Sequence, residues 1–380
     1  MAFSSFWFEP STPLFPPANT VLEYLQRYAD HFSLTKYIRF NERVEEASWS
    51  GQSWNVRLEG GTIQQFDRVV VANGHYSSPR YPEIPGLQDW LDSGKASHSV
   101  YYRNGQPYRD LTVLVIGNGP SGQDISTDVS TVAKTVYHSI TGGIHEDIGN
   151  IKQRGRVSRF QDHGNVIFED DSVSRVDHAI LATGYVLSFP FLPQLRQSSQ
   201  PIVPPLPTHA INSTYNIFPL ARHVFPLQDD FPCDTIAFMG LPSREVAPWP
   251  IFEAQGRFIA KVFADPPSMD REKESHQVIE RFNQLRDTWG DDTTIIAKQW
   301  HRFIELEQFS YRRELLDFAE APQWYPEDWT GEIYLANGEL REAWKKLESN
   351  READEWVRGV GEGGREEWVS MMRRLLKVSQ

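Results

Sequence analysis

Residues 111–126 read Leu-Thr-Val-Leu-Val-Ile-Gly-Asn-Gly-Pro-Ser-Gly-Gln-Asp-Ile-Ser, and this stretch decides the fold. The run 111–116 has the length and the β-branched content of a buried strand in a parallel sheet. Glycines follow at G-x-G-x-x-G spacing, and residues 121–130 are compatible with a helix. A strand, a glycine-rich turn and a helix in this order predict a dinucleotide-binding turn.

Each glycine of this turn has its own physical reason. Gly117 permits the tight turn, Gly119 lets the backbone approach a pyrophosphate, and Gly122 lets helix and strand pack closely. The helix N-terminus offers N–H groups and the positive end of its dipole to phosphate. The alternative is a turn without a ligand, which the flanking strand and helix make the weaker interpretation. The residues predicted to bind a cofactor here are Gly117, Asn118, Gly119, Pro120, Ser121 and Gly122.

The composition limits the class of protein. The chain has 380 residues, and 51 acidic against 38 basic residues give a net charge of −13. This charge argues against nucleic acid and anionic membranes as partners and mainly predicts solubility. The single cysteine, Cys233, allows no intrachain disulfide and no cysteine-based metal site, and we expect a cytoplasmic protein without a bound metal. No apolar run approaches the roughly 18 residues of a membrane span, and residues 1–17 do not resemble a secretory signal.

The second strand of the nucleotide-binding unit is expected at residues 134–139. An NAD-binding unit carries an acidic residue about 20 positions beyond the glycines, which holds the ribose 2′-hydroxyl. Residues 137–141 read Tyr-His-Ser-Ile-Thr and contain no acid. Ser139 and Thr141 could hydrogen-bond a 2′-phosphate, which favours NADP over NAD. Charge could come from a basic residue further on, although a solvated loop is the alternative for all three candidates, Lys152, Arg154 and Arg156.

Two further strands end in a small residue and a glycine. Residues 68–72 precede Asn73-Gly74, and residues 176–182 precede Thr183-Gly184. At such strand ends the backbone can touch a ligand, although a plain turn is the alternative. The repetition suggests two related nucleotide-binding units in one chain.

The remaining stretches predict strands early in the chain and helices late in it. Runs at 38–40, 44–49, 54–58 and 62–66 indicate an antiparallel meander. Asn19 is a candidate cap for a following helix, and residues 1–17 read as an aromatic loop that lies against a folded part of the chain. Later helices are predicted over residues 249–263, 270–288, 294–318, 335–350 and 364–378.

With these motifs in view, the chain resembles the flavin-containing monooxygenases, which have two dinucleotide-binding folds and include Baeyer–Villiger relatives. Residues 117–124 are similar to the family's NADPH turn G-x-G-x-S-G-x-D, and residues 177–192 resemble its D-x-x-x-x-A-T-G-Y-x-x-x-F-P-F-L segment. Gly94, His98 and Tyr102 match the later positions of its fingerprint F-x-G-x-x-x-H-x-x-x-Y/F. The likeness covers roughly two thirds of the chain.

The resemblance implies an α/β fold with two Rossmann-like domains and a helical C-terminal extension. Residues 104–204 would form the NADPH-binding domain, and residues 1–103 and 205–380 an incomplete FAD-type domain. NADPH would reduce FAD, and the reduced flavin would oxygenate a small organic substrate. The remaining flavin contacts would lie near Asn73, Gly74, Thr183, Gly184 and residues 253–255.

The sequence departs from the family pattern at several places. Asp92 stands where the fingerprint begins with Phe, and Thr141 stands where the family often has arginine. The family's first βαβ unit needs about 30 or more residues, and nothing before Ala18 could build it. We therefore expect an open sheet edge with exposed apolar surface, and either a misplaced start or a companion chain that supplies the FAD unit.

The same departures leave several questions open at the level of sequence. The family's active-site Asn also has no counterpart, so the sequence assigns no catalytic residue. A protein that binds NADPH without flavin redox chemistry is the competing hypothesis. A homo-oligomer is compatible with either hypothesis.

Overall fold

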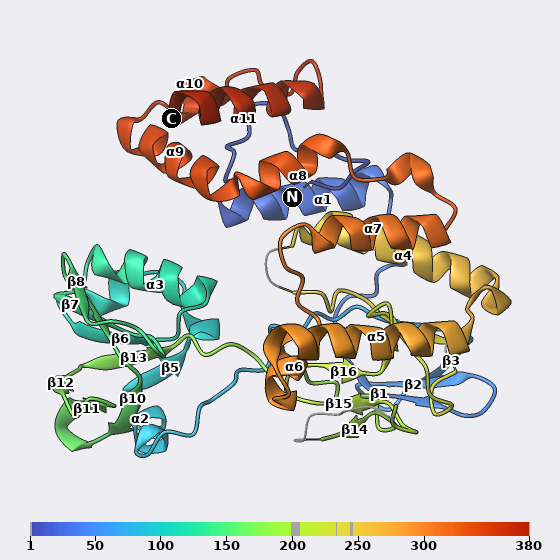
Figure 1. Cartoon of the computed structure of the whole chain (residues 1–380), viewed down its shortest axis with the longest axis horizontal. Helices are drawn as coiled ribbons and strands as arrows, with labels where there is room; N and C mark the ends of the chain where they lie inside the picture. The colour runs from blue at the N-terminus through green and yellow to red at the C-terminus, as the bar shows by residue number, and fades with distance from the viewer. Residues whose placement is uncertain (1, 199–205, 233, 244–245, 380) are drawn as a thin grey trace. The chain divides into compact units, whose positions relative to one another are not determined.

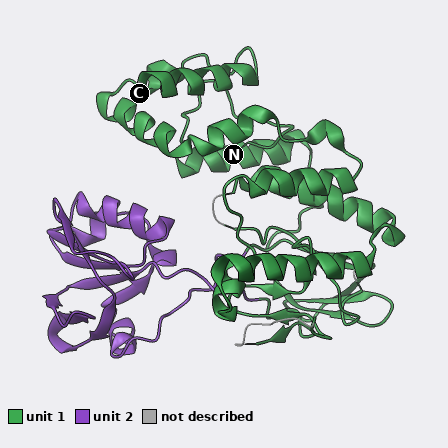
Figure 2. Cartoon of the chain, viewed as in Figure 1, with its two compact units in different colours: residues 1–74, 189–380 green, residues 75–188 purple. Residues whose placement is uncertain are grey.

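The computed structural model describes residues 2–198, 206–232, 234–243 and 246–379. Within these ranges the chain divides into two compact units, unit 1 (Met1–Gly74 and Phe189–Gln380) and unit 2 (His75–Ser188) (Figure 2). The middle unit thus begins earlier than the boundary at residue 104 that the resemblance implies, because the fingerprint segment packs with it. The other implied boundary, at 204, and Cys233 lie outside the described residues.

Unit 2 is built on a six-stranded sheet with the order β5-β13-β6-β7-β9-β8. The strands are β5 (Ala96–His98), β13 (His178–Leu181), β6 (Thr112–Ile116), β7 (Thr135–Ser139), β9 (Ile151–Arg154) and β8 (Glu146–Ile148). All neighbours are parallel except β8 and β9. The predicted strand–turn–helix order is confirmed, since helix α3 (Pro120–Ser130) connects the parallel neighbours β6 and β7 (Figure 1).

Alternating side chains of β6 build a hydrophobic core on each face of this sheet. Val113 and Val115 pack with residues of α3 on one face. Leu114 and Ile116 pack on the other face with helix α2 (Leu87–Asp92) and with the antiparallel strands β10 (Val157–Phe160) and β11 (Asn165–Phe168). Strand β12 (Val173–Arg175) completes this excursion. An apolar run without alternation therefore fits a strand that is buried on both faces.

Unit 1 contains the predicted antiparallel meander. Its strands are β1 (Val44–Trp49), β2 (Trp54–Leu58) and β3 (Ile63–Phe66). The run 38–40 forms no strand, so that part of the prediction is wrong. Ile38 and Phe40 are 47% and 66% exposed, and their side chains do not supply the burial that holds a strand in a sheet.

Strand β4 (Val69–Val71) pairs in parallel with β19 (Ile236–Phe238) in a two-stranded sheet. Within the described ranges, no strand pairs with the opposite edge of β4. Val70 on this strand is 42% exposed, and Tyr37 is 75% exposed. Unit 1 therefore has the open sheet edge and the exposed apolar side chains that the sequence predicts.

Small two-stranded and three-stranded sheets complete the strands of unit 1. One sheet joins β14 (Arg196–Gln197), β15 (Ile211–Asn212) and β16 (Ile217–Phe218), and the other joins β17 (Leu220–Ala221) and β18 (Phe225–Pro226).

The helices of unit 1 correct several predicted boundaries. Helix α1 (Ala18–His31) begins before Asn19 and has Pro17 at its cap position, so Asn19 does not cap it. The predicted helix 294–318 is two helices, α6 (Thr293–Gln299) and α7 (Glu307–Phe318). The break buries Trp300 and Phe303 in the main core, and Glu305 within it has a left-handed φ of 45°. Packing of these aromatic side chains outweighs the helical periodicity.

Four of the other late helices lie close to their predicted ranges: α4 (Pro248–Ala264), α5 (Arg271–Trp289), α9 (Asn337–Asn350) and α11 (Arg365–Ser379). The short helices α8 (Asp328–Leu335) and α10 (Ala353–Val357) were not predicted from the sequence. The N-terminal segment lies against them as predicted: Phe3 stacks on Trp249 of α4, and Phe15 packs on the cluster built by α9 and α11. None of the helices described here has the length and apolar character needed to cross a bilayer.

Candidate functional site

The glycine turn of unit 2 is shaped by steric contacts at its first and third glycines. Gly117 has φ 117°, and a Cβ atom there would lie 2.3 Å from the carbonyl oxygen of Ala182. A Cβ atom on Gly122 would lie 1.9 Å from the carbonyl oxygen of Gly117. At Gly119 a Cβ atom would meet no atom within 4 Å, so this glycine faces open space. The turn thus leaves room for a ligand at its middle glycine.

The start of α3 presents hydrogen-bond donors beside this open space. Gly119 is the cap residue, no side chain caps the helix, and Pro120 stands in its first turn. Ser121 and Gly122 occupy positions whose N–H groups have no acceptor inside a helix. The first turn carries no acidic residue that would repel an anion. The geometry suits a phosphate at the positive end of the helix dipole.

His138 holds the glycine turn through a hydrogen bond, a role that the sequence did not predict. Its buried ring lies on β7, and Nε2–H donates a 2.8 Å hydrogen bond to the Gly117 carbonyl oxygen. The Gly117 N–H donates to the Ser139 carbonyl oxygen at 3.0 Å, so β7 holds both sides of this residue. Because a trans peptide is planar, a Gly117 carbonyl that points at β7 directs the Asn118 N–H the opposite way. The alternation of side chains along β7 places residues 136 and 138 on the face that α3 covers, and this alternation could have indicated the role of His138.

The segment after β7 places the residues considered for a 2′-phosphate. Ser139 is buried, and its hydroxyl donates to the Gly155 carbonyl oxygen at 2.9 Å, whereas Thr141 is exposed. Arg154 is the β9 residue in register with Ser139, at the carboxyl end of both strands. It also pairs with Asp147 at 2.8 Å and lowers the pKa of that carboxyl. Of the three basic candidates for binding a 2′-phosphate, Arg154 is the one that lies beside Ser139 at the end of β9.

The two predicted strand ends adopt the conformations that glycine favours. Gly74 after β4 has φ 74°, and Gly184 after β13 has φ 81°. Asn73 and Gly74 belong to unit 1, whereas Thr183 and Gly184 belong to unit 2. Arg80 donates two hydrogen bonds, of 2.9 and 2.6 Å, to the Thr183 carbonyl oxygen, so the backbone of that turn is held in place.

The three fingerprint residues serve the scaffold of unit 2. The His98 Nδ1 accepts from the Val100 N–H at 3.1 Å, so its hydrogen is on Nε2, which donates to the Gly184 carbonyl oxygen at 2.9 Å. Burial lowers the pKa of His98, which keeps the ring neutral. Gly94 has φ 73° just after α2. The Tyr102 hydroxyl donates to Asp128 on α3. His98 thus connects β5 to the turn after β13.

Comparison with known proteins identifies the family. A family model described as flavin-binding monooxygenase-like matches residues 1–146 and 147–310. These ranges include the glycine turn, the fingerprint and both strand ends. The chain belongs to the flavin-binding monooxygenase-like family. The resemblance inferred from the motifs is therefore confirmed, and so is the class of enzyme, a flavin-dependent monooxygenase.

Individual members of the family are similar to this chain over most of its length. The chain is similar to Flavin-containing monooxygenase FMO GS-OX-like 9 of Arabidopsis thaliana, at 32% identity over 362 residues that cover 90% of this chain and 72% of that protein. It is also similar to Thiol-specific monooxygenase of Saccharomyces cerevisiae, at 33% identity over 279 residues, covering 69% of this chain and 62% of that protein.

A solved structure supports the fold. S-allyl-L-cysteine S-oxygenase from Allium sativum superimposes with a TM-score of 0.70 and 26% identity, covering 98% of this chain and 81% of that one. The α/β fold with Rossmann-like domains and helical C-terminal region is thereby confirmed. Family members use FAD and NADPH in general.

Proposed function

We propose that this flavin monooxygenase uses NADPH to oxygenate a soft sulfur atom in a small organic molecule. The similar proteins named thiol-specific monooxygenase and S-allyl-L-cysteine S-oxygenase support sulfur as the target atom. The observation that carries the proposal is the glycine turn, whose middle glycine faces open space at a helix N-terminus.

NADPH would be held by residues of unit 2. The backbone from Gly117 to Gly122, with Asn118, Gly119, Pro120 and Ser121 between them, would receive the pyrophosphate at the start of α3. Thr141 would face the ribose, and Arg154 would supply the positive charge for a 2′-phosphate, while Ser139 shapes the backbone through its bond to Gly155. The cofactors supply hydride transfer and oxygen activation when bound, and the chain's own residues bind and orient them.

Unit 1 provides fewer groups for FAD. Asn73 and Gly74 leave the backbone open after β4, since a Cβ atom on Gly74 would meet no atom within 4 Å. Among the described residues of unit 1, no G-x-G-x-x-G turn joins a strand to a helix as it does between β6 and α3. We infer that the FAD pyrophosphate needs a strand–turn–helix unit that adds to the open edge of β4.

Substitution of Gly119 tests the proposal. A Cβ atom there would meet no other atom within 4 Å, so the side chain of a valine would extend into the space proposed for the pyrophosphate. We expect Gly119→Val to weaken NADPH binding at least about tenfold. In preparations that retain FAD, it should also abolish NADPH-dependent sulfoxide formation from S-allyl-L-cysteine, measured by mass spectrometry. Gly338→Val, at another open glycine, is the matched control and should leave NADPH binding unchanged. Equal NADPH affinity in Gly119→Val and the parent would contradict the site.

A second candidate function follows from the contrast between the units. The complete turn in unit 2, without a counterpart in the described part of unit 1, favours a protein that binds NADPH without flavin chemistry. A purified chain that quenches NADPH fluorescence, stays colourless with added FAD and consumes no NADPH would support this alternative. Stoichiometric bound FAD would exclude it.

A further inference from the structure

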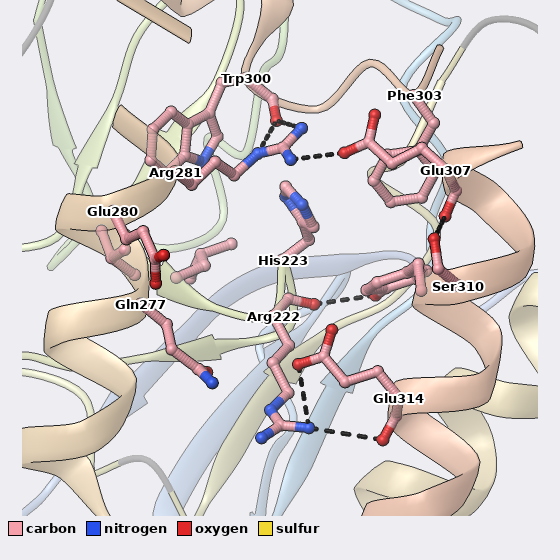
Figure 3. A pocket seen from close by; sticks show the side chains of 13 residues that line it. Arg222, His223, Gln277, Glu280, Arg281, Trp300, Phe303, Glu307, Ser310 and Glu314 are labelled. Carbon is pink, nitrogen blue, oxygen red and sulfur yellow. Dashed lines mark hydrogen bonds and ion pairs between the residues drawn. The ribbon is translucent and has the colours of Figure 1, made fainter. Parts of the chain in front are cut away.

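A polar cavity of about 270 Å³ lies in unit 1, between strand β17 and helices α5 and α7 (Figure 3). His223 follows β17 and lies at the centre of the close-up, with residues of α5 on one side and residues of α7 on the other. Trp300 and Phe303, from the break between α6 and α7, cover one side of the space. None of these residues belongs to the nucleotide turn described above.

Chemistry fixes the hydrogen positions on the two histidines at this cavity. The Ile217 N–H can only donate, and it lies 3.2 Å from His301 Nε2, which therefore accepts. A neutral His301 then carries its hydrogen on Nδ1, which points at the Nδ1 of His223, 3.0 Å away. His223 Nδ1 accepts, so the hydrogen of His223 is on Nε2. Burial, with Arg281 and His301 nearby, lowers the pKa of His223 well below its usual value and keeps the ring neutral.

Two residues that line the cavity, His223 and Trp300, each offer an N–H group to a ligand. His223 Nε2–H points away from His301, in a side chain that lines the space. Trp300 also lines the space and is 1% exposed, and its buried Nε1–H has no hydrogen-bond partner in the described part of the chain. A buried donor without an acceptor is destabilising, so Trp300 Nε1–H favours an oxygen atom brought by a ligand, and His223 Nε2–H can donate to the same atom.

The charged side chains around the cavity favour a cation. Arg281 donates to Glu307 at 2.6 Å and to the Trp300 carbonyl oxygen, and Arg222 pairs with the buried Glu274 at 2.9 Å, so both guanidinium groups are engaged. Two further carboxylates line the space, Glu280 from α5 and Glu314 from α7, and Glu314 also pairs with Arg222 at 3.3 Å, so four carboxylates face two guanidinium groups. Negative charge is therefore in excess and would repel an anion.

We propose that this cavity binds a small organic cation that also carries an oxygen acceptor, an amino alcohol being the simplest member of the class. The ammonium group lies between the carboxylates of Glu280 and Glu314. The oxygen accepts hydrogen bonds from His223 Nε2–H and Trp300 Nε1–H. A simple alkylamine satisfies only the carboxylates, and a carboxylic acid satisfies only the N–H donors.

The indole N–H signal of Trp300, recorded by NMR, tests this site on the full chain without any nucleotide. Loss of one signal in Trp300→Phe assigns it. We expect ethanolamine to shift this signal saturably in the millimolar range, with ethylamine and acetate at least about tenfold weaker. No saturable shift, or acetate as effective as ethanolamine, would overturn the proposal and leave a water-filled cavity.

An exposed carboxylate provides a test that does not endanger the fold. Glu280 is exposed on α5, so Glu280→Gln should leave thermal stability unchanged while weakening ethanolamine binding about threefold, as expected for loss of an exposed charge. Glu272→Gln, on the same helix but outside the cavity, is the matched control and should bind ethanolamine like the parent. Because the readout needs neither NADPH nor FAD, failure here and failure of the proposed oxygenation are separate results.

Discussion

At the scale of single residues, the nucleotide turn depends on side chains that its motif does not contain. The glycines could be predicted from the sequence because each meets a local steric demand, such as the 1.9 Å approach at Gly122. His138 could not be predicted, because its bond to Gly117 depends on how β7 pairs with β6. Ser139 shows the same limit. Its hydroxyl could bind a phosphate according to the sequence, but in the structure it donates a hydrogen bond to the Gly155 carbonyl oxygen.

His138 offers a direct test of this support. His138→Leu leaves the Gly117 carbonyl buried without its donor, and we expect NADPH to bind about tenfold more weakly, as the loss of roughly 1.4 kcal/mol would give. Fluorescence titration measures this effect. His138→Gln retains an N–H donor and should recover most of the affinity. Unchanged affinity in His138→Leu would show that the turn holds its shape without the histidine.

At the scale of elements, hydrophobic periodicity predicts the ranges of regular strands and helices well, but it does not predict where a helix is interrupted. The meander β1 to β3 and helices α4, α5 and α11 lie close to their predicted ranges. The break between α6 and α7 was missed because residues 300–306 keep an apolar pattern that fits a helix, while Trp300 and Phe303 are buried against partners distant in sequence. Such tertiary packing outweighs local propensity.

The buried ion pair between β17 and α5 should contribute to stability as a unit. Glu274 is 2% exposed and accepts hydrogen bonds from Arg222 at 2.9 to 3.2 Å. Glu274→Ala leaves Arg222 with only Glu314 and should cost about 3 kcal/mol of unfolding free energy. Denaturant unfolding measures the change. Glu342→Ala, which breaks an exposed pair with Lys345, should stay within about 1 kcal/mol of the parent.

The open edge of β4 provides a test of how FAD is held. Val69 and Val71 hydrogen-bond to the β19 side, so the backbone of Val70 faces the opposite edge. Val70→Lys keeps the pairing with β19 but places a charge on the half-exposed edge, which discourages addition of a strand. We expect Val70→Lys to retain less FAD than the parent protein, with little change in melting temperature. Retention of FAD by Val70→Lys would argue against strand addition at β4.

At the scale of the whole molecule, buried histidines in both units predict how stability depends on pH. Burial lowers the pKa of His98, His178 and His223, so the unfolded chain binds protons that the folded chain does not. Their contribution to the free energy of unfolding is fully present above the ordinary histidine pKa of about 6.5 and is lost as pH falls below it. Glu314, whose pKa is raised by burial, acts in the opposite direction at lower pH. Melting temperature should therefore fall by at least about 1 °C between pH 7.5 and 5.5 for each kcal/mol lost. His98→Gln should flatten this slope, whereas substitution of the exposed His276 by Gln should not, and equal slopes in the two variants would show that His98 is not a source of the acid sensitivity.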